Sequence, residues 1–223
     1  LLTLMGKAVI FDKDGTLLDF DATWNEAVGA AFDQIADQNA KIRAAEVFGY
    51  DLTCRCVLPH SAFVSETSDT TDDLVADLID VAAFKQTLNE ASRRTVVASR
   101  GAGSALESLA ERGWKLAVAT NDSELLATEH IEALAWGQLF TSIMGFDSGY
   151  GAKPGPGMVL AAAEACDALD GVYLMVGDSV HDILAGRAAG AVTVAIGDHP
   201  AALQLADHTI DQLGDLVDLA ESL

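Results

Sequence analysis

Short apolar runs alternate with longer amphipathic stretches through most of the chain after residue 100, and one such run opens it. Apolar runs of this length, bounded by polar residues, are typical of strands buried in a parallel sheet. We expect five strands: Ala8–Phe11, Lys115–Ala119, Ser142–Met144, Val172–Val176 and Val192–Ile196. Apolar residues three or four positions apart predict helices between them: Ser104–Arg112, Glu124–Leu134, Met158–Ala168 and Ile183–Ala189. Strands that alternate with helices predict an α/β fold with a doubly wound parallel sheet.

The pattern is all helical between the first strand and residue 95. Asp21 can cap a first helix, and further helices are expected at Ile42–Phe48, Asp72–Val81 and Ala83–Ala91. The irregular stretch Gly49–Thr71 lies among them, and we expect no strand in this part of the chain. We therefore predict a core domain, residues 1–19 and 96–223, interrupted by an α-helical cap domain, residues 20–95.

The charge of the chain narrows the choice of partners. Its 223 residues include 13 basic and 34 acidic ones, for a formal net charge of −21. Such a surface repels the phosphates of nucleic acids and of anionic membranes, so neither is expected to bind. It also disfavours a small anionic substrate unless a metal ion or a few placed cations reverse the field locally. Nothing in the sequence decides between a monomer and a homodimer.

The cysteines and the apolar runs give information on the cellular compartment of the protein. The Cys54-x-Cys56 pair could form a disulfide or hold a soft metal ion, but no second pair or histidine cluster has zinc-site spacing. The pattern favours free thiols, as in a reducing cytosol. The apolar opening Leu1–Met5 lacks the basic region and cleavage site of a signal peptide. No charge-free run approaches the roughly 20 residues of a membrane span. We expect a soluble, cytoplasmic protein.

Polar side chains follow four of the expected strands at their carboxyl ends. They are Asp12 and Asp14, Thr120 and Asn121, Lys153, and then Asp178, Ser179 and Asp182. Ligands of open parallel sheets bind at this edge, so these side chains are expected to converge. Two acids one residue apart would repel each other in a partly buried loop unless a cation or a shared proton relieves them. Carboxylates, a lysine and hydroxyl donors suit Mg²⁺ together with a phosphoryl group.

Four segments at these strand ends resemble the motifs of the haloacid dehalogenase-like (HAD) hydrolase superfamily, in the family's order. They are Asp12-Lys13-Asp14-Gly15-Thr16, then Ala119-Thr120-Asn121-Asp122, then Lys153-Pro154, and last Gly177-Asp178-Ser179-Val180-His181-Asp182. Together they cover nearly all of the chain outside the expected cap. The overall pattern is most similar to phosphoglycolate phosphatase-like members. The second acid, Asp14, is absent from the dehalogenase branch, so the resemblance favours phosphate chemistry.

The resemblance implies a role for each motif residue. Asp12 would be the nucleophile and Asp14 the general acid and base, with Lys153 beside them. Gly15, Thr16, Thr120, Asn121 and Lys153 would hold phosphate oxygens. Mg²⁺ would be bound by Asp12, the backbone carbonyl of Asp14, and Asp178. Behind these ligands, Asp182 would either orient a water bound to the metal or pair with Lys153, and Ser179 would lie beside it. The cap would close over the site and set its specificity.

Three further residues are expected to meet the substrate. Lys13 stands where the family more often has an apolar residue, and its side chain would either reach toward the cap to bind an anionic substrate or simply point to solvent. Arg55 and His60 in the irregular part of the cap are candidates for the substrate's other end, although Arg55 could instead pair with a nearby acid. His181 is expected at the surface, and no role is assigned to His130.

The sequence thus predicts a Mg²⁺-dependent phosphatase that hydrolyses a small phosphate monoester, phosphoglycolate-like or a sugar phosphate, through an aspartyl-phosphate. A phosphomutase of the same family would keep every residue named above. A non-catalytic binding protein on this fold is a third possibility, although it would not need a nucleophile and an acid together.

Overall fold

Six parallel strands form the central sheet of the computed structural model, which describes residues 6–223. Their order is β5-β4-β1-β6-β7-β8. The strands span Lys7–Phe11 (β1), Lys115–Ala119 (β4), Phe140–Met144 (β5), Val172–Gly177 (β6), Val192–Ile196 (β7) and His208–Ile210 (β8). The predicted α/β fold with a doubly wound sheet is confirmed. The strand β8 was not predicted, because three residues are too short to show a period.

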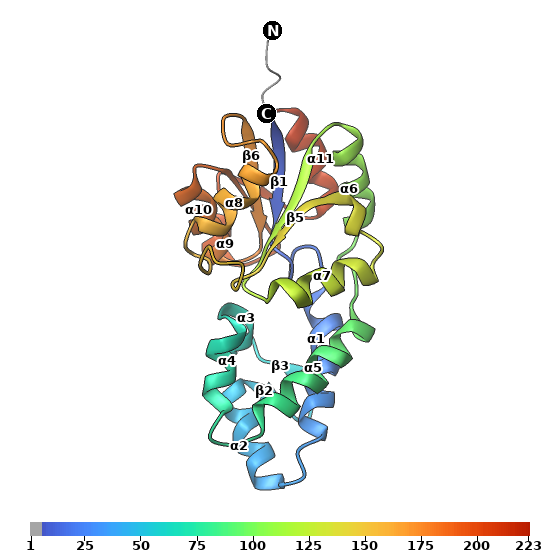
Figure 1. The fold of residues 1–223 in the computed structure, drawn as a ribbon, viewed down its shortest axis with the longest axis vertical. Helices are drawn as coiled ribbons and strands as arrows, with labels where there is room; N and C mark the ends of the chain where they lie inside the picture. Colours follow the sequence, from blue (N-terminus) through green and yellow to red (C-terminus); the bar gives the residue numbers. More distant parts are fainter. Residues whose placement is uncertain (1–5) are drawn as a thin grey trace. The chain divides into compact units, whose positions relative to one another are not determined.

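Alternation along the strands divides the apolar core into two layers. Val9 and Phe11 of β1 face one layer, whereas Ala8 and Ile10 face the other. Side chains of α6 (Ala102–Glu111), α7 (Glu124–Ala133) and α11 (Leu213–Glu221) fill the first layer. Those of α8 (Gly157–Ala165) and α9 (Val180–Ala189) fill the second. Figure 1 shows α6 and α11 on one side of the sheet and α8, α9 and α10 (Pro200–Leu205) on the other. Full burial of each aliphatic side chain is worth roughly 1.5–3 kcal/mol, so the sheet is a firm support for the loops at its edge.

The chain divides into two compact units, one made of the residues up to Leu18 with Ala98–Leu223, the other of Asp19–Val97. The second unit contains α1 (Phe20–Asp33), α2 (Gln38–Phe48), α3 (Ala62–Ser65), α4 (Ser68–Val75) and α5 (Val81–Thr95). Aromatic rings form its core: the ring centroid of Phe32 lies 4.9 Å from that of Phe84 and 5.6 Å from that of Phe48. We call this unit the cap unit and the other the core unit.

Several expectations for the cap unit were wrong. Two short antiparallel strands, Tyr50–Asp51 (β2) and Cys56–Val57 (β3), lie where no strand was predicted. A two-residue strand carries no periodic signal, which explains the omission. The first helix is capped by Asp19, whose carboxylate accepts from the Ala22 N–H, rather than by Asp21. The helix expected at Asp72–Val81 ends at Val75, and Asp80 instead caps α5.

The expectation of free thiols was wrong for two of the three cysteines. Cys54 and Cys56 form a disulfide, while Cys166 is free and buried. The tight turn between β2 and β3, in which Arg55 has a φ of 55°, brings the Cα atoms of the two cysteines to 5.5 Å. The cysteines therefore no longer support a reducing compartment. Among residues 6–223 no helix has the length and apolarity needed to cross a membrane. The segment Leu1–Met5, where no signal peptide was expected, lies outside the described residues.

Candidate active site

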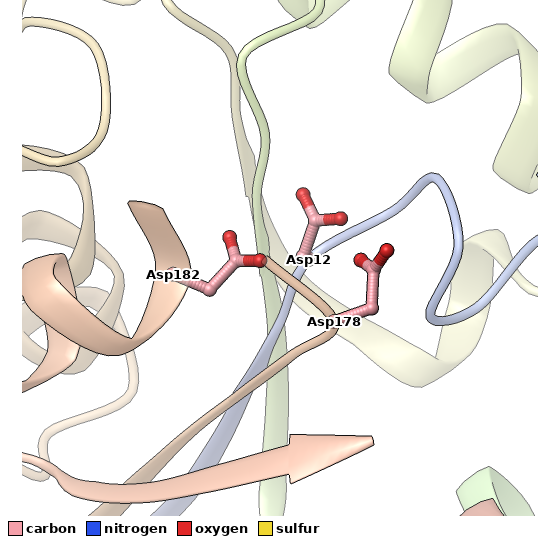
Figure 2. A group of neighbouring side chains, drawn as sticks. All are labelled: Asp12, Asp178 and Asp182. Carbon is pink, nitrogen blue, oxygen red and sulfur yellow. The ribbon is translucent and has the colours of Figure 1, made fainter. Parts of the chain in front are cut away.

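Three carboxylates meet at the carboxyl edge of the sheet. Asp12 follows β1, Asp178 follows the neighbouring strand β6, and Asp182 lies in the first turn of α9. One oxygen atom from each lies within 4.8 Å of the others. Figure 2 shows the three side chains pointing to the same side of the sheet edge. The Asp12 N–H donates to the Val176 carbonyl at 2.8 Å, which fixes the end of β1 against β6. We call Asp12, Asp178 and Asp182 the acid group.

A buried lysine stands within this acid group. The Lys153 ammonium lies 2.5 Å from Asp12 Oδ1 and 2.6 Å from Asp182 Oδ1. Its backbone is held by Asn121, whose Nδ2 donates to the Lys153 carbonyl at 3.0 Å and whose Oδ1 accepts from the Lys153 N–H at 2.8 Å. The loops after β4 and β5 are thereby joined, and Lys153 is delivered to Asp12. The Asn121 side chain thus holds the lysine loop, and a phosphate contact of Asn121 stays a prediction.

The residues after Asp12 hold Asp178 in place. Gly15 has a φ of 82°, and a Cβ at this position would overlap the Asp178 carboxylate. Only glycine combines that backbone conformation with such a close approach. Its N–H donates to the Leu18 carbonyl at 2.9 Å, and the Thr16 hydroxyl donates to Asp178 Oδ1 at 3.3 Å. In this structure both residues shape the acid group, although the sequence suggested phosphate contacts for them.

Ser179 and Asp182 form a capping box at the start of α9. The Ser179 N–H and hydroxyl both donate to Asp182 Oδ2, at 2.9 and 2.6 Å. Since Asp182 Oδ1 accepts from Lys153, both oxygens of this carboxylate have protein donors. The sequence offered Asp182 either a water bound to the metal or Lys153 as its partner, and the structure shows the lysine.

Burial and mutual repulsion shift the pKa values of the acid group. Burial raises the pKa of Asp12 to about 7, against the opposing attraction of Lys153. Burial, then the charges of Asp12 and Asp182, raise the pKa of Asp178 well above its usual value. Burial works against the Lys153 charge, but attraction by Asp12 and Asp182 outweighs it and the pKa of Lys153 is raised. Three carboxylates thus share one ammonium, and a further cation there would relieve their repulsion.

The Thr120 hydroxyl is also placed at this edge. Thr120 directly follows β4, is buried, and its Oγ1 accepts from the Asp122 N–H at 3.1 Å. A hydroxyl that accepts a hydrogen bond can also donate one, because its O–H is separate from its lone pairs. Thr120 can therefore serve as a donor to an anion, as the sequence suggested.

The solvent-facing alternative for Lys13 was wrong, because its side chain is fully buried. A contact between Lys13 and a substrate stays a prediction. The Lys13 ammonium lies 2.6 Å from Asp14 Oδ2, 3.2 Å from Asp122 Oδ2 and 3.3 Å from His130 Nδ1. We call these four residues the Lys13 cluster. Burial opposes the charge of Lys13, but attraction by Asp14 and Asp122 outweighs it and raises the pKa of Lys13.

Sequence reasoning gave no role to Asp122 and His130, the two other partners of Lys13. His130 is fully buried on α7, on the same face as Leu126, Ala127 and Ile131. A histidine among the apolar positions of a helix was the signal that could have found it. Asp122 was quoted in the second motif without a role, and burial raises its pKa.

The cap residues proposed for substrate binding have other surroundings. Arg55 pairs with Glu26 at 3.0 Å and with Asp33 at 2.9 Å, so its charge is matched within the cap unit, as the alternative expectation had it. His60 is exposed and His181 is partly exposed. A role for His60 stays a prediction.

Comparison with known proteins identifies the family. The family described as haloacid dehalogenase-like hydrolase matches residues 9–196, which include all four strand-end motifs. The chain belongs to this family. It is 31% identical over 191 residues to a phosphoglycolate phosphatase of Neisseria meningitidis, covering 85% of this chain and 80% of that protein. It is 26% identical over 194 residues to the pyrophosphatase PpaX of Halalkalibacterium halodurans, covering 85% and 82%.

A solved structure agrees on the fold. YfnB from Bacillus subtilis, a HAD hydrolase determined with bound magnesium, superposes with a TM-score of 0.73 at 18% identity, over 97% of this chain and 99% of that one. The protein is thus a HAD-family hydrolase similar to phosphoglycolate phosphatases.

Proposed function

We propose that this HAD-family hydrolase is a Mg²⁺-dependent phosphatase that hydrolyses a small phosphate monoester through an aspartyl-phosphate on Asp12. The observation that carries the proposal is the placement of a buried carboxylate, Asp12, 2.5 Å from a buried ammonium, Lys153, inside a group of three acids. Such a set offers a nucleophile, a cation for phosphate oxygens, and oxygen ligands for a metal ion.

The donors present fit Mg²⁺. Hard divalent cations prefer oxygen ligands, and the acid group supplies only carboxylates. Both Asp182 oxygens already accept from Lys153 or Ser179, so we assign the metal to Asp12, Asp178 and the Asp14 carbonyl, with Asp182 as the support of Lys153. When bound, Mg²⁺ would neutralise negative charge on the acid group and on the transferring phosphoryl group.

The first step follows from this placement. One oxygen of the Asp12 carboxylate attacks phosphorus in line, and an O–P bond forms as the bond from phosphorus to the ester oxygen breaks. Asp14 gives its proton to the departing oxygen, so an alcohol leaves rather than an alkoxide. Lys153, the Thr120 hydroxyl and the Asn121 backbone N–H hold the phosphoryl oxygens during transfer.

The second step restores the enzyme. Water attacks phosphorus of the aspartyl-phosphate while Asp14, now ionised, takes a proton from it. The bond between phosphorus and the Asp12 oxygen breaks, which regenerates the Asp12 carboxylate and releases inorganic phosphate. Atoms and charges balance over the two steps, and no other co-reactant is needed.

Similarity guides the substrate class. The phosphoglycolate phosphatase relative is the more similar of the two compared above, so we infer a small phosphate ester of an acid or a sugar. The part of the substrate that carries the phosphate would be recognised by residues 20–95, the cap domain of the sequence prediction. His60 stays a candidate for that contact. A cytoplasmic location and a monomeric or homodimeric state belong to the same proposal.

The test is Mg²⁺-dependent phosphate release from a panel of phosphomonoesters that includes phosphoglycolate and glucose phosphates. We expect turnover that EDTA removes and that Asp12→Asn lowers on the order of 10⁴-fold or more, as loss of a nucleophile does elsewhere. Asp170→Asn, which changes an exposed aspartate before β6, is the matched control and should match the wild type.

Three results would contradict the proposal. Turnover that survives in Asp12→Asn would remove the nucleophile assignment. A wild-type protein without turnover on any ester would remove the phosphatase. Slow hydrolysis that requires a bisphosphate activator would indicate the phosphomutase instead.

A further inference from the structure

The Lys13 cluster lies beside the acid group but does not belong to it. Lys13 comes from the loop after β1, Asp122 from the loop after β4, and His130 from α7. Two of the partners of Lys13 are distant from it in the sequence: His130 is 117 positions away, and Asp122 lies in the loop after β4. The Asp14 carboxylate takes part in this cluster, whereas the acid group comprises Asp12, Asp178 and Asp182.

Burial makes the contacts of Lys13 decisive. A fully buried ammonium must be compensated by nearby acceptors, because its desolvation costs several kcal/mol. An ammonium has three N–H donors, and three polar side-chain atoms lie within 3.3 Å of this one: Asp14 Oδ2, Asp122 Oδ2 and His130 Nδ1. Acceptance by Nδ1 puts the proton of a neutral His130 on Nε2. Acceptors from three separate segments fix the position of the ammonium.

The fixed ammonium restrains Asp14. The Asp14 side chain is 20% exposed and therefore lies at the border of the buried cluster. An ionised carboxylate two residues from Asp12 would be drawn toward any cation held by the acid group. Contact with Lys13 at 2.6 Å opposes that movement and holds one carboxylate oxygen on the side of Asp122 and His130.

We propose that Lys13, anchored by Asp122 and His130, is a positioning residue that holds the Asp14 carboxylate where it can protonate the leaving group. This inference rests on the proposed function, in which Asp14 is the general acid. Lys13 then acts through Asp14 alone and touches neither phosphate nor metal. Its removal should therefore harm the reaction in proportion to how much the leaving group needs a proton.

The test is how the effect of a Lys13 substitution on kcat/KM depends on the leaving group. A lysine that only stabilises the fold would affect all leaving groups equally. Nitrophenolate leaves unaided, whereas phenolate benefits from protonation, and the two aryl phosphates have nearly the same shape. The ratio of kcat/KM for 4-nitrophenyl phosphate to that for phenyl phosphate reports the first step only, up to release of the phenol. General acid catalysis contributes about 10²–10⁴-fold, so Lys13→Met should raise this ratio on the order of tenfold or more.

Further variants separate positioning from folding. The double variant Lys13→Met/Asp122→Asn removes the ammonium together with one buried charge, and should raise the ratio equally. Asp122→Asn alone removes one anchor and should raise it less. Lys115→Met is the matched control, because Lys115 also pairs with an aspartate at 2.6 Å, but at the exposed start of β4. Circular dichroism checks folding of each variant.

The outcomes distinguish the inference from the proposed function. A raised ratio in the Lys13 variants, with an unchanged ratio in Lys115→Met, supports it. An equal loss on both substrates, no change on either, or failure of all three cluster variants to fold would overturn it and leave the proposed function standing. A wild-type protein inactive on both esters and on the phosphomonoester panel would overturn the proposed function and this inference with it.

Discussion

Two buried lysines stand beside the two acids of the Asp12–Asp14 pair, and their surroundings differ. Lys153 contacts Asp12 and Asp182, with Asp178 in the same group of carboxylates. Lys13 contacts Asp14 and Asp122, and its third neighbour is the imidazole of His130. The first lysine shares its charge among three acids, whereas the second has two acids and one neutral acceptor.

The two lysines differ in how far their charge is balanced by the acids around them. Around Lys153 negative charge is in excess, and the pKa values of Asp12 and Asp178 are raised. An added cation is favoured there. Around Lys13 two carboxylates and one imidazole surround a single ammonium, which is fully buried. In the proposed mechanism, Asp12 therefore works with a metal ion, whereas Asp14 is restrained by Lys13.

The largest expected effect is that of Lys153→Met. Loss of the ammonium leaves three neighbouring carboxylates uncompensated and removes a donor to the phosphoryl group. We expect kcat to fall about 10²–10³-fold, as when one electrostatic group of an active site is deleted. The free energy of unfolding without metal should also fall, and its increase on adding Mg²⁺ should exceed that of the wild type. Phosphate release and urea unfolding with and without Mg²⁺ measure these quantities, with Lys115→Met as control. Near-normal activity would show that Lys153 only supports the fold.

The next effect is a pH dependence of the metal-free protein. The pKa of Asp12 is about 7 in the folded state and 3.8 by its ordinary value, so between these pH values the folded state binds more protons. The contribution of Asp12 to stability therefore increases as pH falls from about 7 toward 4. Urea unfolding in EDTA at several pH values should show this increase in the wild type and a flatter profile in Asp12→Asn.

The pH dependence of stabilisation by Mg²⁺ provides a second test of the raised pKa of Asp12. Protons and the cation compete for the same oxygens, so Mg²⁺ should stabilise the wild type more at pH 7.5 than at about pH 5.5. Profiles of the same slope for wild type and Asp12→Asn would contradict the assignment of a raised pKa to Asp12.

The smallest expected effect is that of Asp122→Asn on metal binding. The variant keeps Lys13 in contact with Asp14 and His130, and its loss of stability should be about 1–3 kcal/mol, as for one buried charged contact. The stabilisation produced by Mg²⁺ should equal that of the wild type, measured by thermal unfolding over a Mg²⁺ titration. A weaker response to Mg²⁺ would show that the two lysine clusters are coupled, and the contrast between them would no longer hold.

The parts predicted correctly depend on short-range pattern. Four of the five expected strands agree with the structure to within one residue at each end, and the fifth, Ser142–Met144, is part of β5. These strands could be predicted because buried strands leave continuous apolar runs in the sequence. The convergence of Asp12, Asp178 and Asp182 followed from the rule that parallel strands end at one edge. The direction of Lys13 could not be predicted in this way. The sequence left Lys13 either reaching toward the cap or pointing to solvent, because two of its three partners, Asp122 and His130, lie more than a hundred residues later in the chain.

The sequence by itself determined which acids, which lysine and which hydroxyl follow each strand. These strand-end residues also indicated the HAD family. The sequence could do so because strand periodicity and strand-end motifs are local properties. Only the tertiary structure decided which lysine serves which acid, that Asn121 holds the Lys153 loop, and that Cys54 pairs with Cys56. Those choices depend on distances between segments that folding brings together, and on burial, which makes a charge costly unless the fold supplies its partner.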